Sequence, residues 1–108
     1  MEKLDLPQGT LDLLVLRVLA AGEMHGWGIA QRLSVLSKEA LQLQEGTLYP
    51  ALYRMEAKGW IAAEWAQSEN NRKAKYYSLT KIGRKRLEAE KEDWDRLTGV
   101  VAQVLHNA

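Results

Sequence analysis

Apolar residues recur at helical spacing in three segments of the first sixty residues. The pattern predicts a helix over residues 8–21, a shorter one over Gly26–Ser37, and a third that begins near Glu45. Gly22 and Gly59 follow the first and third patterns, where glycine commonly ends a helix. The expected inward residues are Leu11, Leu13, Leu14, Val15, Leu16, Val18 and Leu19, then Ile29, Ala30, Leu33 and Leu36, then Leu48, Ala51, Leu52 and Met55.

The hydrophobic period changes to two after Gly59. In residues 61–66, Ile61, Ala63 and Trp65 share one face and alternate with smaller or charged residues, which predicts a half-buried strand. A polar segment, residues 68–74, then predicts a turn, and its two asparagines, Asn70 and Asn71, suit positive φ angles.

Residues 75–80 predict the returning strand of a hairpin, with Tyr77 and Leu79 on one face. Thr80 is a suitable N-cap for a last helix that runs toward the C-terminus.

This element order predicts a mainly α fold with a small β-hairpin. Three helices, a hairpin with a basic tip and a long final helix follow the order of a winged helix-turn-helix domain. We therefore expect a winged helix-turn-helix DNA-binding domain in residues 1–80 and a C-terminal dimerisation helix in residues 81–108. In such a domain the third helix enters the major groove of DNA, and the hairpin tip, called the wing, contacts the backbone.

The composition narrows the class of protein. A chain of 108 residues, 46% of them apolar, is one domain by size. The absence of cysteine excludes disulfides, thiolate nucleophiles and cysteine-based metal sites. The N-terminus lacks the apolar region of a signal peptide, and no apolar run approaches the ~18 residues of a membrane span. We expect a cytoplasmic protein with no membrane partner.

The sequence contains no catalytic constellation. His25 and His106 lie far apart, without metal-ligand spacing near either, and no P-loop or dinucleotide-binding motif occurs. His25 stands at a predicted helix start, where a capping role is the ordinary explanation. The prediction is a protein that is not an enzyme and that holds neither metal nor cofactor.

The net charge of +1 hides an asymmetry along the chain. Residues 70–87 carry seven basic side chains and no acidic one, and an acidic cluster follows directly. Such a distribution indicates a surface that faces a polyanion. The alternative is that these charged side chains only keep the surface solvated. The basic residues are Arg72, Lys73, Lys75, Lys81, Arg84, Lys85 and Arg86, and the acidic ones are Glu88, Glu90, Glu92, Asp93 and Asp95.

The third predicted helix carries an outward side suited to DNA. Thr47, Pro50, Tyr53 and Arg54 lie off its apolar stripe, and Tyr49 lies at the edge. Tyrosine hydroxyls can donate to phosphate oxygens. The alternative is that both tyrosines pack at the rim of a small core. A proline is tolerated in the first helical turn, whose amides have no intrahelical partner.

Three segments resemble the signature segments of the PadR family of bacterial transcriptional regulators. They are "HGWGIAQRL" at residues 25–33, "EGTLYPALYRMEAKGWI" at residues 45–61 and "RKAKYYSLTKIGRKRL" at residues 72–87. The chain departs from the family pattern at Trp27, where tyrosine is usual, and at Trp60, where an aliphatic residue is usual. We expect both tryptophans to touch the core.

The resemblance implies a homodimeric DNA-binding repressor that a small molecule releases from its operator. It points to Thr47, Tyr49, Pro50 and Arg54 on the third helix and to basic residues of the wing. The candidate DNA-contacting residues are Thr47, Tyr49, Pro50, Tyr53, Arg54, Asn71, Arg72, Lys73 and Lys75.

The final helix carries a heptad seam. Leu87, Trp94 and Val101 are seven residues apart. They interleave with a second series of the same spacing, Glu90, Leu97 and Val104, in which only Glu90 is polar. A second copy of the chain is the expected cover; the alternative is that the seam folds back on the first helix. The predicted dimer interface is Leu87, Trp94, Leu97, Val101, Val104 and Leu105.

Trp94 suggests an effector site. A tryptophan pair across a two-fold axis, next to Glu90, Asp93 and Asp95, could sandwich a planar cation. The alternative is that Trp94 only packs the dimer. For the chain as a whole, the alternative to operator binding is a protein–protein module whose basic wing contacts an acidic partner.

Overall fold

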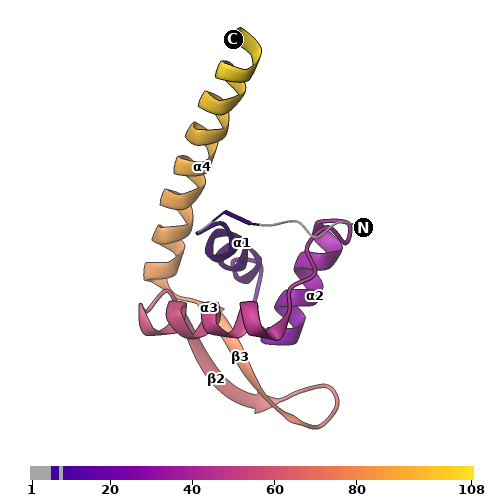
Figure 1. Cartoon of the computed structure of the whole chain (residues 1–108). Coiled ribbons are helices and arrows are strands. Elements are labelled where there is room, and N and C mark those ends of the chain that lie inside the picture. Colours follow the sequence, from indigo (N-terminus) through magenta and orange to yellow (C-terminus); the bar gives the residue numbers. More distant parts are fainter. Residues whose placement is uncertain (1–5, 8) are drawn as a thin grey trace.

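The computed structural model describes residues 6, 7 and 9–108. Within these residues, four helices and a small antiparallel sheet form a winged helix-turn-helix domain from which the last helix projects (Figure 1). The elements are α1 (Thr10–Leu19), β1 (Met24–His25), α2 (Gly26–Leu36), α3 (Glu45–Ala57), β2 (Ile61–Gln67), β3 (Lys73–Leu79) and α4 (Lys81–Asn107).

The predicted hairpin is confirmed, and a third strand joins it. β2 and β3 pair in antiparallel register, from Ile61 opposite Leu79 to Gln67 opposite Lys73. β1 pairs with the other edge of β3, which gives the order β1-β3-β2. β1 was not predicted, because a strand of two residues shows no alternation of apolar and polar positions in the sequence.

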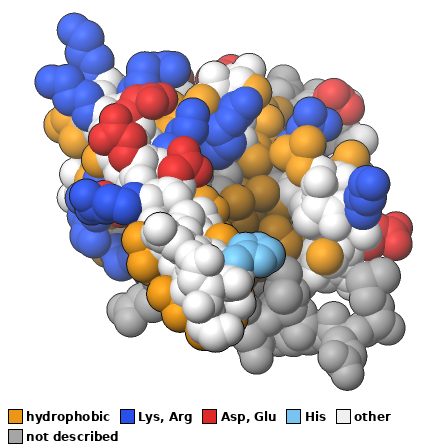
Figure 2. All heavy atoms as spheres, turned by 90° about the horizontal axis from the view of Figure 1, so that it is seen from above, with side chains coloured by type: hydrophobic (Ala, Val, Ile, Leu, Met, Phe, Trp, Pro, Cys, Tyr) orange, Lys and Arg blue, Asp and Glu red, His pale blue; other side chains and the backbone are white. Residues whose placement is uncertain are grey.

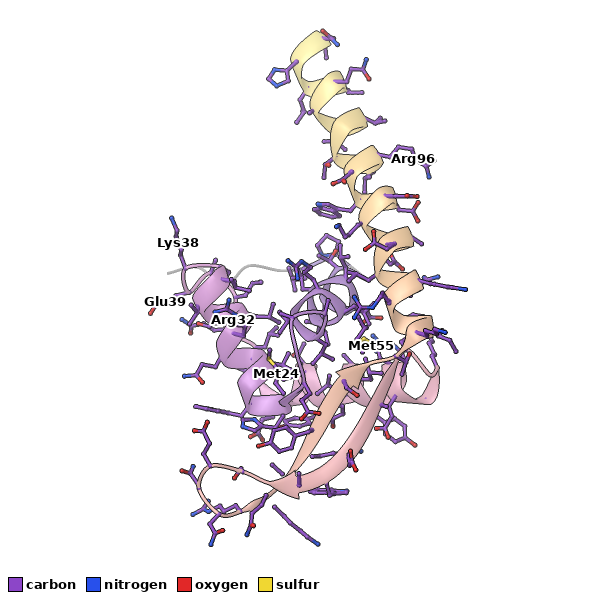
Figure 3. The ribbon with its side chains drawn as sticks, turned by 180° about the vertical axis from the view of Figure 1, so that it is seen from behind. Met24, Arg32, Lys38, Glu39, Met55 and Arg96 are labelled. Atoms are coloured by element: carbon purple, nitrogen blue, oxygen red, sulfur yellow. The ribbon has the colours of Figure 1, made fainter. Side chains whose placement is uncertain are left out.

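The core lies where α1, α2 and α3 meet the sheet. Val15, Leu16, Ile29, Leu52 and Met55 are fully buried there. Figure 3 shows Met55 in the interior between α1 and α3. The helical apolar stripes of the three segments are therefore confirmed, with one exception in α2.

Leu36 was expected to face inward, and this is wrong. Its side chain is 57% exposed, beside the equally exposed Val35. The last turn of α2 extends past the elements on which its first turns pack, and Lys38 and Glu39 mark this protruding end in Figure 3.

Two tryptophans were also expected inside and lie outside. Trp65 continues the alternation of β2, but there the strand has passed the core, and the side chain is 63% exposed. Trp27, on the first turn of α2, is 66% exposed. Trp60 does pack against the core, and the cations of Lys58 and Arg86 both lie over its ring.

Thr80 fixes the start of α4. Its hydroxyl accepts a hydrogen bond from the amide of Gly83 at 2.9 Å, as the predicted N-cap requires, and donates to the Gly59 and Trp60 carbonyls. A Cβ on Gly83 would lie 1.9 Å from the Trp60 carbonyl oxygen, so only glycine fits. These contacts hold the first turn of α4 against the residues that follow α3.

From residue 91 onward, every residue of α4 is exposed. The helix leaves the domain and does not fold back over α1 (Figure 1). Leu87 was assigned to the dimer seam, but it is only 3% exposed and belongs to the core of its own chain, because it lies in the second turn of α4. No described helix is long and apolar enough to cross a membrane.

Candidate nucleic-acid interface

α3 offers its exposed side to solvent at the end of the domain opposite the free part of α4 (Figure 1). Thr47, Pro50 and Tyr53 are all exposed, Tyr53 at 74%. Pro50 is the sixth residue of α3 and so lies beyond its first turn. The Gly46 carbonyl therefore lacks its intrahelical donor, which is tolerable because Gly46 is exposed to water.

Tyr49 combines packing with exposure. Its side chain is 42% exposed, yet a Cβ built on Gly26 would lie 2.7 Å from its ring and its hydroxyl oxygen. The phenol thus rests on the first residue of α2, where only glycine leaves room for it. Tyr49 packs at the rim of the core and still presents its edge at the start of α3.

Arg54 forms an ion pair that the sequence pattern did not reveal. Its guanidinium nitrogen lies 2.5 Å from an Asp12 carboxylate oxygen on the first turn of α1. The Asp12 side chain is 12% exposed and that of Arg54 is 48% exposed. Arg54 therefore ties α3 to α1, and half of its side chain remains open to a ligand.

The tip of the wing, defined here as residues 68–75, consists of a tight turn and the first residues of β3. The Ser68 amide donates to the Arg72 carbonyl at 2.7 Å, and Asn71 adopts the expected positive φ of 61°. Asn70 does not share that conformation. The turn leaves Arg72 and Lys73 exposed.

Lys75 differs from the other wing cations because it is already paired. Its ammonium donates to a Glu56 carboxylate oxygen at 3.0 Å and lies 5.7 Å from the centre of the Tyr77 ring. The hydrogen bond to Glu56 raises the pKa of Lys75 above its ordinary value. This contact links the wing to α3.

The basic run continues onto α4, where it divides into two groups. Lys81, Arg84 and Lys85 are exposed. Arg86 stacks 4.9 Å from the centre of the Trp60 ring and pairs with Glu90 at 2.6 Å. The charge of Arg86 is therefore already paired within the chain. In the wing, the exposed cations are Arg72 and Lys73.

His25 has the predicted capping role. Its Nδ1 accepts a hydrogen bond from the Gly28 amide at 3.0 Å and so caps α2, while its ring meets the edge of Tyr76. Among the residues that the structure describes, no group of three His, Asp or Glu side chains is placed to hold a metal ion.

The rest of the predicted dimer seam is exposed. Figure 2, which looks along α4 from its free end, shows apolar side chains on the flank of this helix and in a hollow between it and α2. The exposed apolar residues of α4 in this region are Trp94, Leu97, Val100, Val101, Val104 and Leu105. Val100 was not among the predicted interface residues.

The amino-acid sequence matches the family described as "Transcriptional regulator PadR-like family" over residues 15–89. The chain belongs to this family. The matched residues run from the core of α1 to the third turn of α4, so the match includes α3 and the wing.

Solved PadR structures share the fold. A PadR family transcription regulator from Clostridium difficile superposes with a TM-score of 0.77 at 34% identity, over 90% of this chain and 99% of that chain. A PadR-like transcriptional regulator from Bacillus cereus gives a TM-score of 0.80 at 27% identity, over 94% and 96% of the two chains. A transcriptional regulator from Mycobacterium tuberculosis is 32% identical over 85 residues, 79% of this chain and 76% of that protein.

Membership in the PadR-like family makes this chain a DNA-binding transcriptional regulator. The similar proteins named above are transcriptional regulators. The winged helix-turn-helix predicted from the order of elements is confirmed.

Proposed function

We propose that this chain is a repressor that binds a pseudo-palindromic operator as a homodimer and is released by a small molecule. The observation that carries the proposal is the placement of two surfaces at opposite ends of the chain. α3 and the wing lie at one end, and the free half of α4 projects from the other (Figure 1). One end can therefore contact DNA while the other holds a second copy.

The DNA contacts in this proposal come from α3 and the wing. α3 enters the major groove, with Thr47, Tyr49 and Pro50 near its leading end and Tyr53 donating to a phosphate. Arg72 and Lys73 neutralise phosphates from the wing, with Asn71 shaping the turn. Arg54 and Lys75 act mainly through their ion pairs, which hold α3 and the wing in place.

The apolar seam of α4 supports the proposed homodimer. Leu97, Val101 and Val104 expose about half of their side-chain surface in the single chain. Burying such surface stabilises an assembly by roughly 25 cal/mol per Å². An isologous pairing of two α4 helices covers both seams, and each partner helix also fills the hollow between α4 and α2 of the other chain.

The size of the chain fits an operator with half-sites one turn apart. Its extents are 56 × 35 × 21 Å. The middle dimension is close to the ~34 Å of one helical turn of DNA that separates half-sites of two-fold regulators. Two domains side by side would thus reach successive major grooves.

Trp94 is the proposed effector contact. It is 39% exposed on the seam, and a pair of indoles across a two-fold axis suits a planar cation. Of the carboxylates that neighbour it in the sequence, Glu90 pairs with Arg86 and Asp93 with Arg96. We expect Trp94→Phe to keep the dimer and to weaken binding of a planar cationic dye such as ethidium. Equal dye affinity in both proteins would remove Trp94 from the effector site.

The salt dependence of DNA binding tests the proposed contacts. Replacing Arg72 and Lys73 by glutamine removes four charges from a dimer. We expect the log–log slope of affinity against salt, about −0.9 per phosphate neutralised, to become less steep by about 3.6. Lys38→Gln, at the far end of α2, is the matched control and should keep the wild-type slope. An unchanged slope in the double variant would favour the protein–protein alternative.

A further inference from the structure

A groove separates the start of α2 from the wing. The β2–β3 loop curves beneath the first turn of α2 (Figure 1). The groove between them is open to solvent and has a volume of about 750 Å³. Its walls come from all three strands, from the first half of α2, from Tyr49 of α3 and from the wing. No motif in the sequence indicates it, because its walls are distant along the chain.

Two largely exposed indoles line this groove. Trp27 and Trp65 each leave about two thirds of their side-chain surface open to water. Tryptophan is a large apolar side chain with one N–H donor, and it is enriched where proteins bind partners. Two such side chains in one groove are therefore better explained by an occupant than by packing within the chain.

The charges of the groove select an anionic occupant. Arg72 and Lys73 line it and are exposed, whereas Lys75 is paired with Glu56. The one acidic residue in its wall is Glu69. An occupant must therefore offer negative charge to the wing and an apolar surface to the indoles.

A DNA strand has this chemistry, because anionic phosphates alternate with deoxyribose rings that have apolar faces. The groove is also continuous with the proposed DNA surface, since Tyr49 is part of both. Contacts of this kind position a protein on the duplex and carry no direct sequence information.

We propose that one strand of bound DNA runs through this groove, with Trp27 and Trp65 packed on deoxyribose rings and donating their indole N–H groups to phosphates. Arg72 and Lys73 neutralise the phosphates of the same strand. The proposal rests on the DNA binding proposed above and adds the start of α2 and the face of β2 to the interface.

The first test is the Trp27→Phe/Trp65→Phe double variant, which keeps two aromatic rings and removes both donors. The variant loses the hydrogen bonds from the indole N–H groups to charged phosphates. We therefore expect the affinity for DNA to fall about 10-fold or more. The loss should be similar on a duplex recovered by selection and on a random duplex. Trp60→Phe, outside the groove, is the matched control and should bind as the wild type does.

Fluorine NMR of the wild-type chain carrying 5-fluorotryptophan provides a test without substitution. On adding DNA, we expect the resonances of Trp27 and Trp65 to shift and to lose their sensitivity to exchange of H₂O for D₂O, while that of Trp60 stays in place. Resonances of Trp27 and Trp65 that respond to benzoate but not to DNA would make the groove a small-molecule site and overturn the proposal.

The outcomes separate this proposal from the proposed function. If the wild-type chain binds DNA and the double variant binds within twofold of it, the groove does not hold a strand, although the proposed function stands. If the wild-type chain binds no DNA, both proposals fail.

Discussion

At the scale of single residues, two ion pairs hold the DNA-facing elements in position. Arg54 joins the last turn of α3 to Asp12 of α1, 42 residues away, and Lys75 joins the wing to Glu56 of α3, 19 residues away. Exposed pairs of this kind contribute about 0–1 kcal/mol to stability, and the pair with the nearly buried Asp12 should lie at the upper end. Their main effect is therefore on orientation.

Lys75 and Tyr77 predict how stability changes at alkaline pH. The hydrogen bond to Glu56 raises the pKa of Lys75, and burial raises the pKa of Tyr77. In the folded chain both groups keep a proton at pH values where the unfolded chain has lost it. The free energy of unfolding is therefore undiminished below about pH 10 and falls as the pH rises further.

Urea denaturation between about pH 9 and pH 11 measures this fall. Tyr77→Phe should make the fall in the free energy of unfolding shallower, because the variant lacks the buried hydroxyl whose ionisation favours unfolding. A Tyr77→Phe profile as steep as that of the wild type would contradict the assignment.

At the scale of elements, α2 and α3 end in the same hydrogen-bonded motif with different residues at its left-handed position. After α3, Trp60 donates to the Met55 carbonyl and Gly59 to that of Glu56, with Gly59 at φ 76°. After α2, Glu39 donates to the Ser34 carbonyl. There the left-handed position is held by Lys38, at φ 53°, whose Cβ makes the conformation costly.

Lys38→Gly should therefore stabilise the chain. Glycine adopts positive φ without the Cβ penalty, so we expect a gain of about 0.5–1 kcal/mol in the free energy of unfolding. Thermal denaturation at one fixed protein concentration measures it. Lys38→Ala retains the Cβ and should give no comparable gain; a gain as large as that of Lys38→Gly would show that side-chain charge, and not backbone conformation, is responsible.

The sequence predicted the helices and strands better than it predicted which of their side chains are buried or paired. Apolar periodicity located three helices and the hairpin, and Gly59 and Thr80 marked boundaries that the structure confirms. Period alone could not show that Leu36 and Trp65 lie beyond the edge of the core. Ion pairs such as Arg54–Asp12 join distant segments, so no local pattern reveals them. The predicted DNA contacts and the dimer remain predictions, because each needs a partner.

At the scale of the whole molecule, α4 has more apolar surface than its own chain covers. Its second turn is anchored by Leu87 in the core, and its free half carries an exposed apolar seam. Arg96 points away from the domain on the opposite side of the helix (Figure 3). α4 is thus amphipathic, as expected for a helix that pairs with a second copy.

Val101→Glu should break the proposed dimer. It places a charge in the middle of the seam, where two-fold symmetry sets it close to the same charge of the partner. Analytical ultracentrifugation should show a monomer at concentrations where the wild-type chain is a dimer. Arg96→Glu adds the same side chain outside the seam and should leave the dimer intact. A Val101→Glu dimer as stable as that of the wild type would place the interface elsewhere.

Selection of bound sequences from a random duplex library at physiological salt tests the central claim most directly. If two chains place their α3 helices in successive major grooves, the recovered sequences will share a motif with two-fold symmetry and half-sites about one turn, ~34 Å, apart. Recovery of no motif, or of a single asymmetric half-site, would contradict a homodimeric, operator-specific regulator.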